Sequence, residues 1–110
     1  MLKLQLPLRT GRGLNGREHH MARHRRVKTE REAVAWLLRG KRPPAPPVVV
    51  TMTRLAPSSG LDSDNLQGAL KAVRDELAMW LGLDDADPRV TWLCAQRRAP
   101  WGVEIEVRTM

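Results

Sequence analysis

Hydrophobic residues near the N-terminus alternate with polar residues or proline. The hydrophobic positions are Leu2, Leu4, Leu6 and Leu8. Successive side chains of a strand point to opposite faces, so this period of two predicts a half-buried β-strand. Pro7 cannot donate a hydrogen bond to a neighbouring strand. We therefore expect this strand to lie at the edge of a sheet or to end at Pro7.

Residues 25–39 show the spacing of three and four residues that is typical of an amphipathic helix. The hydrophobic positions in this segment are Val27, Val34, Leu37 and Leu38. Trp36 is predicted to lie beside them in the core. Gly40 suits the C-cap of the helix, because glycine adopts the left-handed conformation at little cost.

A second segment, which ends at Gly82, has the clearest helical pattern in the chain. Its hydrophobic positions are Leu66, Leu70, Val73, Leu77 and Leu81. Ser63 or Asp64 can cap its start and Gly82 its end. Trp80 falls on the apolar side of this helix and is also predicted to lie in the core.

Three further segments are rich in β-branched residues and predict strands. Residues 48–54 contain five β-branched residues, which indicates a buried strand, and they follow a proline-rich connector at 43–47. Residues 90–96 and 103–108 are the other two, and we expect residues 97–102 to join them as a β-hairpin. The predicted order is β-α-β-α-β-β. The sequence thus predicts a single α+β domain over residues 1–110, with a mixed sheet packed against two helices.

The composition limits where the chain acts. It is 42% hydrophobic, which is enough for one core, although a domain of 110 residues gains from dimerisation. No apolar run approaches a membrane span or a secretory signal. Cys94 is the single cysteine, which excludes an internal disulfide and fits a reducing compartment. We therefore expect a cytoplasmic protein with no membrane partner.

Positive charge is concentrated in the first half of the chain. Residues 1–61 carry 13 Lys and Arg against three Glu, a net charge of +10, whereas residues 62–110 have a net charge of −3. A strongly basic segment favours a polyanionic partner, and we expect nucleic acid. The predicted phosphate contacts are Arg17, Arg23, Arg25, Arg26 and Lys28. The alternative is a basic surface that only contacts solvent.

Acidic residues gather around the second predicted helix. Asp62 and Asp64 precede it, and carboxylate oxygens are ligands that Mg²⁺ prefers. Asp64, Lys71 and Asp75 fall within about 40° of one another on the helix, opposite the apolar stripe. A second acidic group follows the helix at Asp84, Asp85 and Asp87. The structural alternative is that these residues are an N-cap, a solvated helix face and a turn.

Residues 61–92 resemble the RusA family of Holliday junction resolvases, which are crossover junction endodeoxyribonucleases common in phages and prophages. The family pattern is Asp-x-Asp-Asn-Leu, then Lys-Ala-x-x-Asp-x-Leu on a helix, then Asp-Asp and a strand. The matching segments here are Asp62–Leu66, Lys71–Leu77 and Asp84–Asp85. A weaker likeness in the order of the elements covers most of the chain.

The resemblance implies a site and an activity. It implies Mg²⁺, with Mn²⁺ as an alternative, held by Asp62, Asp64 and Asp85, and a catalytic lysine at Lys71. It also implies a homodimer that nicks opposing strands of a four-way DNA junction in recombination and repair, with no nucleotide cofactor. Asp84 and Asp87 are alternative third ligands.

One departure from the family pattern concerns the lysine. The family has it four residues after the second aspartate, where this chain has Gly68, and Lys71 follows three residues later. Residues four and seven positions after Asp64 share a helical face. Lys71 would therefore point to the same side of the helix as the family's lysine, about one turn further along.

Two other functions compete with the resolvase. One is a nucleic-acid-binding protein without catalysis, in which the aspartates are structural. The other is a nuclease that acts on other branched DNA, such as flaps or replication forks.

Overall fold

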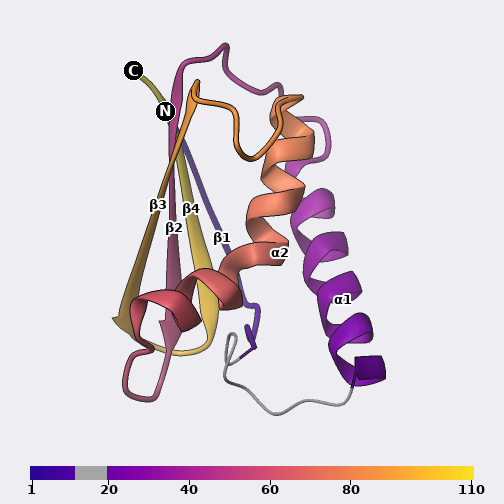
Figure 1. Ribbon diagram of the computed structural model, residues 1–110, viewed down its shortest axis with the longest axis vertical. Helices are drawn as coiled ribbons and strands as arrows, with labels where there is room; N and C mark the ends of the chain where they lie inside the picture. The colour runs from indigo at the N-terminus through magenta and orange to yellow at the C-terminus, as the bar shows by residue number, and fades with distance from the viewer. Residues whose placement is uncertain (12–19) are drawn as a thin grey trace.

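The computed structural model describes residues 1–11 and 20–110. Its elements are β1 (Leu2–Leu6), α1 (His20–Leu38), β2 (Val48–Ala56), α2 (Ser63–Leu81), β3 (Val90–Arg98) and β4 (Gly102–Thr109). This confirms the predicted β-α-β-α-β-β order and the α+β class. Figure 1 shows the sheet as one layer, with both helices on the same side of it.

The four strands form one mixed sheet in the order β1-β4-β2-β3. β1 is antiparallel to β4, β4 is antiparallel to β2, and β2 is parallel to β3. β1 therefore lies at an edge and ends before Pro7, as predicted. β2 is almost entirely buried, which suits a strand with a neighbour on each side and helices over one face.

The predicted hairpin between the last two strands is wrong. β3 and β4 do not pair, because β2 lies between them. Residues 99–101 instead cross the end of β2, where the amide of Ala99 donates to the carbonyl of Ala56 at 3.0 Å. The strongly apolar β2 takes the central position, and the two half-polar strands flank it.

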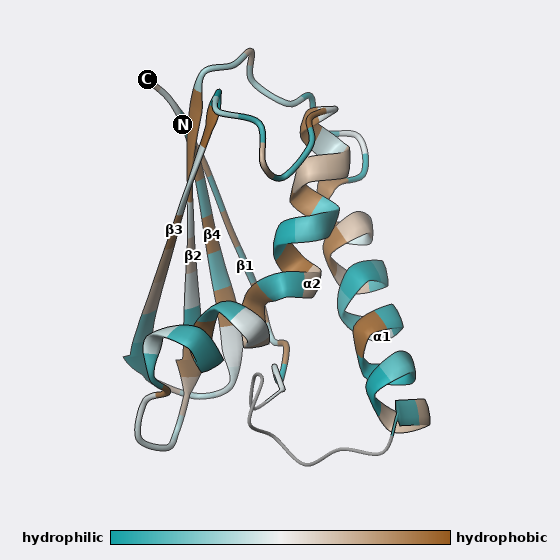
Figure 2. Cartoon of the chain, in the orientation of Figure 1, coloured by the Kyte–Doolittle hydropathy of each residue, from teal (hydrophilic) through white to brown (hydrophobic). Residues whose placement is uncertain are grey.

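The core lies between the helices and one face of the sheet. Alternate strand residues point to this face, and those of β4, Val103, Ile105 and Val107, are almost completely buried. The helices contribute the buried side chains Val34, Leu38, Leu66, Leu70, Val73 and Leu77. Figure 2 shows hydrophobic and hydrophilic positions alternating along both helices, which is the pattern of helices with one buried side.

Both helices differ from the prediction at their starts. α1 begins at His20 rather than near Arg25. The N-cap of α2 is Asp62, not Ser63 or Asp64, and Gly82 ends this helix in the left-handed conformation with φ 72°. Gly40, after α1, also has a positive φ of 77°, as expected for a residue that terminates a helix.

The prediction that Trp36 lies in the core is wrong, since 72% of its surface is exposed. The buried positions of α1 include Val34 and Leu38. Trp36 lies two residues from each of them, about 200° around the helix. Trp80 and Trp92 are partly buried against the core. In the described parts of the chain, no helix is long and apolar enough to cross a membrane.

Candidate functional site

Asp62 and Asp64 lie at the start of α2 and both side chains are exposed. Asp62 has a structural task. Its two carboxylate oxygens accept hydrogen bonds from the backbone and side-chain nitrogens of Asn65, at 2.9 and 3.0 Å. Asp64 is in the first turn, where a negative charge interacts favourably with the helix dipole. Only the carboxylate of Asp62 caps the helix, so the carboxylate of Asp64 contributes less to the fold.

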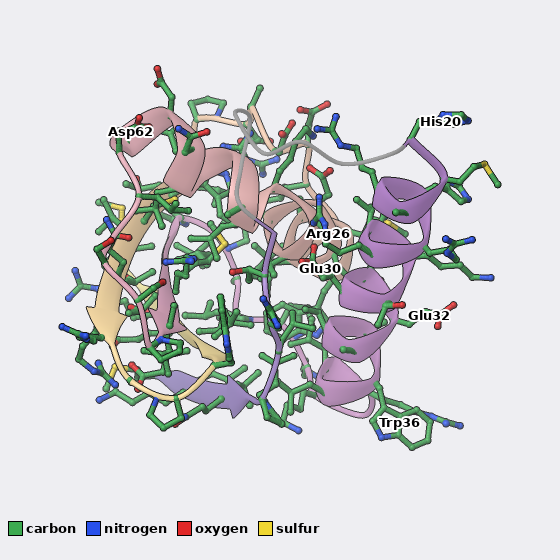
Figure 3. The ribbon with its side chains drawn as sticks, turned by 90° about the horizontal axis from the view of Figure 1, so that it is seen from below. His20, Arg26, Glu30, Glu32, Trp36 and Asp62 are labelled. Atoms are coloured by element: carbon green, nitrogen blue, oxygen red, sulfur yellow. The ribbon has the colours of Figure 1, made fainter. Side chains whose placement is uncertain are left out.

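The preceding residue fixes this end of α2 to the sheet. The amide of Leu61 donates to the side-chain oxygen of Gln96 at 2.8 Å, and the side-chain nitrogen of Gln96 donates back to the carbonyl of Leu61 at 2.7 Å. Asp62 and Asp64 therefore lie at the end of the sheet where the parallel strands β2 and β3 both terminate. Figure 3 shows Asp62 on the side of the molecule away from the labelled residues of α1.

Lys71 lies on the same helix and is exposed. Its ammonium group forms an ion pair with Asp75 at 3.0 Å. This contact is the one that the spacing of four residues favours on a helix. Asp75 thus holds Lys71 on the polar side of α2, as the sequence predicted.

Asp85 is held by an arginine that the sequence analysis did not single out. Arg74 donates from its Nη2 to Oδ2 of Asp85 at 3.0 Å. This hydrogen bond, with smaller effects of Asp84 and Lys71, lowers the pKa of Asp85 below its ordinary value. Arg74 also lies over the ring of Trp92 at 5.9 Å, and the indole nitrogen of Trp92 donates to the carbonyl of Asp85. The signal was present in the sequence, because Arg74 follows Lys71 by three residues on the same side of the helix.

The remaining acidic residues of the turn stabilise the turn itself. Oδ1 of Asp84 accepts from the amide of Ala86, and Asp87 accepts from the backbone and side chain of Arg89. The guanidinium of Arg89 lowers the pKa of Asp87. Both residues act as the turn-forming aspartates that the sequence allowed as an alternative.

The aspartates as they lie do not fit a preformed magnesium site. The Asp62 end of α2 is bound to β3 at Gln96, whereas Asp85 is bound at Trp92. These contact points are four residues apart on β3, and the carboxylates of Asp62 and Asp85 already accept hydrogen bonds from Asn65 and Arg74. Within residues 1–11 and 20–110, no three His, Cys, Asp or Glu residues are grouped so that they could hold a metal ion.

The predicted phosphate contacts divide into two kinds. Arg23, Arg25 and Lys28 are exposed on α1. Arg26 instead pairs with Glu30, whose side chain is buried, at 3.1 Å, as Figure 3 shows on the inner side of the helix. Arg17 lies outside the described residues.

Sequence reasoning also missed Arg54 near the end of β2. It is 4% exposed, and its Nε donates to the hydroxyl of Thr10 at 3.3 Å. Its guanidinium lies 5.5 Å from the centre of the Trp101 ring, and Arg9 lies over the same ring at 4.8 Å. The signal was the alternation along β2, because Arg54 continues the core-facing series of Val50 and Met52.

Neither the comparison with protein-family models nor the search of curated proteins finds a match to this chain.

Proposed function

We propose that this protein is a structure-selective DNA endonuclease that acts on four-way junctions, with Mg²⁺ binding together with the substrate rather than at a preformed site. The motif resemblance around Asp62, Asp64 and Lys71 supports this assignment. The observation that carries it is that Asp62 and Asp64 at the start of α2, and Lys71 about two turns along the helix, are all exposed. A substrate phosphate could approach that side without disturbing the core.

The residues of this chain have separate parts in the proposal. Asp64 presents a carboxylate at the sheet edge, and Lys71 presents a positive charge that can stabilise negative charge on a reacting phosphate. Asp75 orients Lys71. Because Asp85 is bound to Arg74 and the described residues form no metal-binding group, these steps are carried by the protein side chains alone.

Paired nicking of a junction requires two sites, so we propose that the protein acts as a homodimer. An exposed apolar patch on the helices supports this part. It is formed by Ala35, Trp36, Met79 and Trp80. Sedimentation equilibrium of the wild-type protein and Trp36→Glu tests it. We expect a dimer that the variant dissociates, and a wild-type monomer at all concentrations would contradict it.

A second candidate is a junction-binding or duplex-binding protein without catalysis. The observation that favours it is that three of the proposed site residues already have protein partners. Asp62 caps α2, Lys71 pairs with Asp75, and Asp85 pairs with Arg74. All three contacts are common structural devices.

One assay separates the two candidates. Labelled four-way junction and linear duplex of the same sequence are incubated with the protein in Mg²⁺, in Mn²⁺ and in EDTA. The key variant is Asp64→Asn, which keeps the size of the side chain and the N-cap of α2. The matched control is Glu106→Gln, which removes a carboxylate from β4 on the face of the sheet opposite the core.

The endonuclease proposal expects paired nicks in the junction that require the metal, disappear in Asp64→Asn and persist in Glu106→Gln. Binding of the junction without cleavage in either metal would favour the second candidate. Equal cleavage of the linear duplex would mean a nuclease without junction selectivity.

A further inference from the structure

Arg54 is a buried cation without a carboxylate partner among the described residues. Within residues 1–11 and 20–110, its one hydrogen bond goes from Nε to the hydroxyl of Thr10, and the ring of Trp101 is a close neighbour. Burial lowers the pKa of Arg54, because loss of solvent disfavours the charged form. A guanidinium has five N–H donors, so most of those of Arg54 remain available. The terminal nitrogens of Arg54 are not among the fully buried unpaired atoms, so they can reach a ligand in the cavity that this residue lines.

The guanidinium borders a cavity of about 250 Å³ at the edge where β2 and β3 end. The other residues that line it are Ser58, Ser59, Gly60, Gln96, Arg97 and Arg98. The cavity thus combines arginines with two hydroxyl groups, and none of its lining residues is acidic. This is the donor set that recognises a phosphate group.

The two other arginines of the cavity differ in their availability. Arg97 is bound through both terminal nitrogens to Glu104, so its charge is already compensated. Arg98 uses Nε to donate to the carbonyl of Pro57 at 3.3 Å, which holds the side chain against the loop after β2. Arg98 is paired in register with Ala56, two residues beyond Arg54, and therefore points to the same face of the sheet. Arg54 and Arg98 are the uncompensated positive charges of the cavity.

We propose that this cavity binds a phosphate group of a nucleic-acid backbone, with Arg54 and Arg98 as its charged donors and Ser58 and Ser59 as its hydroxyl donors. Gly60 and Gln96 connect the cavity to the exposed aspartates. Gln96 lines the cavity and also binds Leu61, the residue before Asp62. A phosphate held here would place the neighbouring phosphodiester beside the start of α2.

Anion binding follows from the cavity itself, whereas the identity of the anion as a DNA phosphate rests on the proposed function. The test therefore uses two probes in EDTA, without any cleavage. Inorganic phosphate is titrated into ¹⁵N-labelled protein at constant ionic strength, with chloride as the comparison salt. A four-way DNA junction is then added to a second sample. The signals followed are the backbone amides of residues 58–60 and the indole N–H of Trp101.

Three variants accompany the titration. Arg54→Gln removes the buried charge. Ser59→Glu places a carboxylate at the mouth of the cavity from an exposed loop, and so tests the site without altering the core. Arg108→Gln is the matched control, because Arg108 is an exposed arginine at the far end of β4.

We expect saturable shifts of these signals with phosphate but not with chloride, and the same signals to respond to the junction. Arg54→Gln should weaken phosphate binding about tenfold or more, the effect of losing one charge-assisted hydrogen bond. Ser59→Glu should weaken it at least as much, because its carboxylate repels the anion, and Arg108→Gln should leave it unchanged. Shifts that do not saturate, or that persist in Ser59→Glu, would overturn the site. A response to phosphate but not to the junction would overturn the assignment to nucleic acid. Absence of DNA cleavage would overturn the proposed function alone.

Discussion

Asp62 contributes to the fold and to the proposed site through the same carboxylate. Both oxygens accept hydrogen bonds from Asn65, and the backbone carbonyl of Asp62 accepts the first hydrogen bond of the helix, from Leu66. An N-cap hydrogen bond stabilises a helix, whereas the negative charge is not needed for it. The two roles can therefore be separated by substitution.

We predict that Asp62→Ala lowers the free energy of unfolding by about 1 kcal/mol, because alanine cannot cap α2. Asp62→Asn keeps a capping oxygen and should stay close to the wild type in urea denaturation. If the proposed endonuclease activity uses the charge of Asp62, both variants lose junction cleavage. An Asp62→Asn protein that is as unstable as Asp62→Ala would contradict this separation.

Arg74 determines how Asp85 responds to pH. Its hydrogen bond is the largest cause of the lowered pKa of Asp85. A carboxyl group whose pKa is lower in the folded state contributes stability above its unfolded pKa, and loses it as the pH falls through the folded pKa. The contribution of the Arg74–Asp85 pair to the free energy of unfolding is therefore present at neutral pH and disappears in acid.

We predict that Arg74→Gln moves the pKa of Asp85 upward, toward the ordinary value for aspartate. Carbon-detected NMR titration of the Asp85 carboxylate measures this directly. The stability difference between the wild type and the variant should narrow at acid pH, below the ordinary range of an aspartate. An unchanged Asp85 titration in the variant would mean that the ion pair does not form in solution. Lys71→Gln serves as the comparison, because Lys71 has only a weaker effect on the same group.

The helix α2 links the core to the polar side that carries Asp64 and Lys71. Leu70 is completely buried, and its neighbour Lys71 is exposed. We predict that Leu70→Ala lowers the free energy of unfolding by about 2–5 kcal/mol, the range for a truncated core leucine. At protein concentrations too low for the proposed dimer, Trp36→Ala on α1 should change it by less than about 1 kcal/mol, because a side chain exposed in the monomer loses few contacts. Chemical denaturation of both variants at these concentrations tests the assignment, and a large loss in Trp36→Ala would show that the tryptophan is covered within the monomer.

The elements themselves were predictable from the sequence, because each follows a local rule. The alternation of leucines predicted β1, the apolar stripe predicted α2, and Gly82 predicted its end. The pairing of β3 and β4 was not predictable in this way. Both strands are adjacent in sequence and half-polar, so a hairpin satisfies the local pattern equally well. β2 lies between β3 and β4 because its apolar side chains become buried there. That burial depends on contacts between residues that are distant in sequence, so local patterns do not predict it.

The candidate site was predictable only where it lies within one element. Asp64, Lys71 and Asp75 share a side of α2 by helical geometry, and the ion pair follows from their spacing. The position of Asp85 depends on how the turn after α2 packs against Arg74 and Trp92, which is a tertiary contact. The buried Arg54 could have been suspected from the period of β2, but its cavity requires the loop after that strand and the end of β3.

On the scale of the whole molecule, two separate basic regions are candidates for contact with DNA. One is the first half of α1, where Arg23, Arg25 and Lys28 are exposed, and the other is the sheet edge with Arg54 and Arg98. Figures 1 and 3 both place the start of α2 away from α1. A DNA molecule that contacts both regions would cross the molecule from the helix to the sheet edge. Branched DNA, with arms in several directions, suits two such regions.

The contribution of α1 can be measured through the salt dependence of binding. Each phosphate that a protein neutralises steepens the fall of log K with log salt by about 0.9 for duplex DNA. We predict that replacing Arg23, Arg25 and Lys28 together by glutamine weakens junction binding in EDTA and reduces the magnitude of that slope by about 2–3. The matched control replaces Arg39, Lys41 and Arg42, three exposed basic residues just beyond the other end of α1, and changes the net charge equally. If DNA lies along the first half of α1, only the first set changes the slope. Equal changes in both sets would mean that the net charge of +7 attracts DNA without a defined contact on this helix.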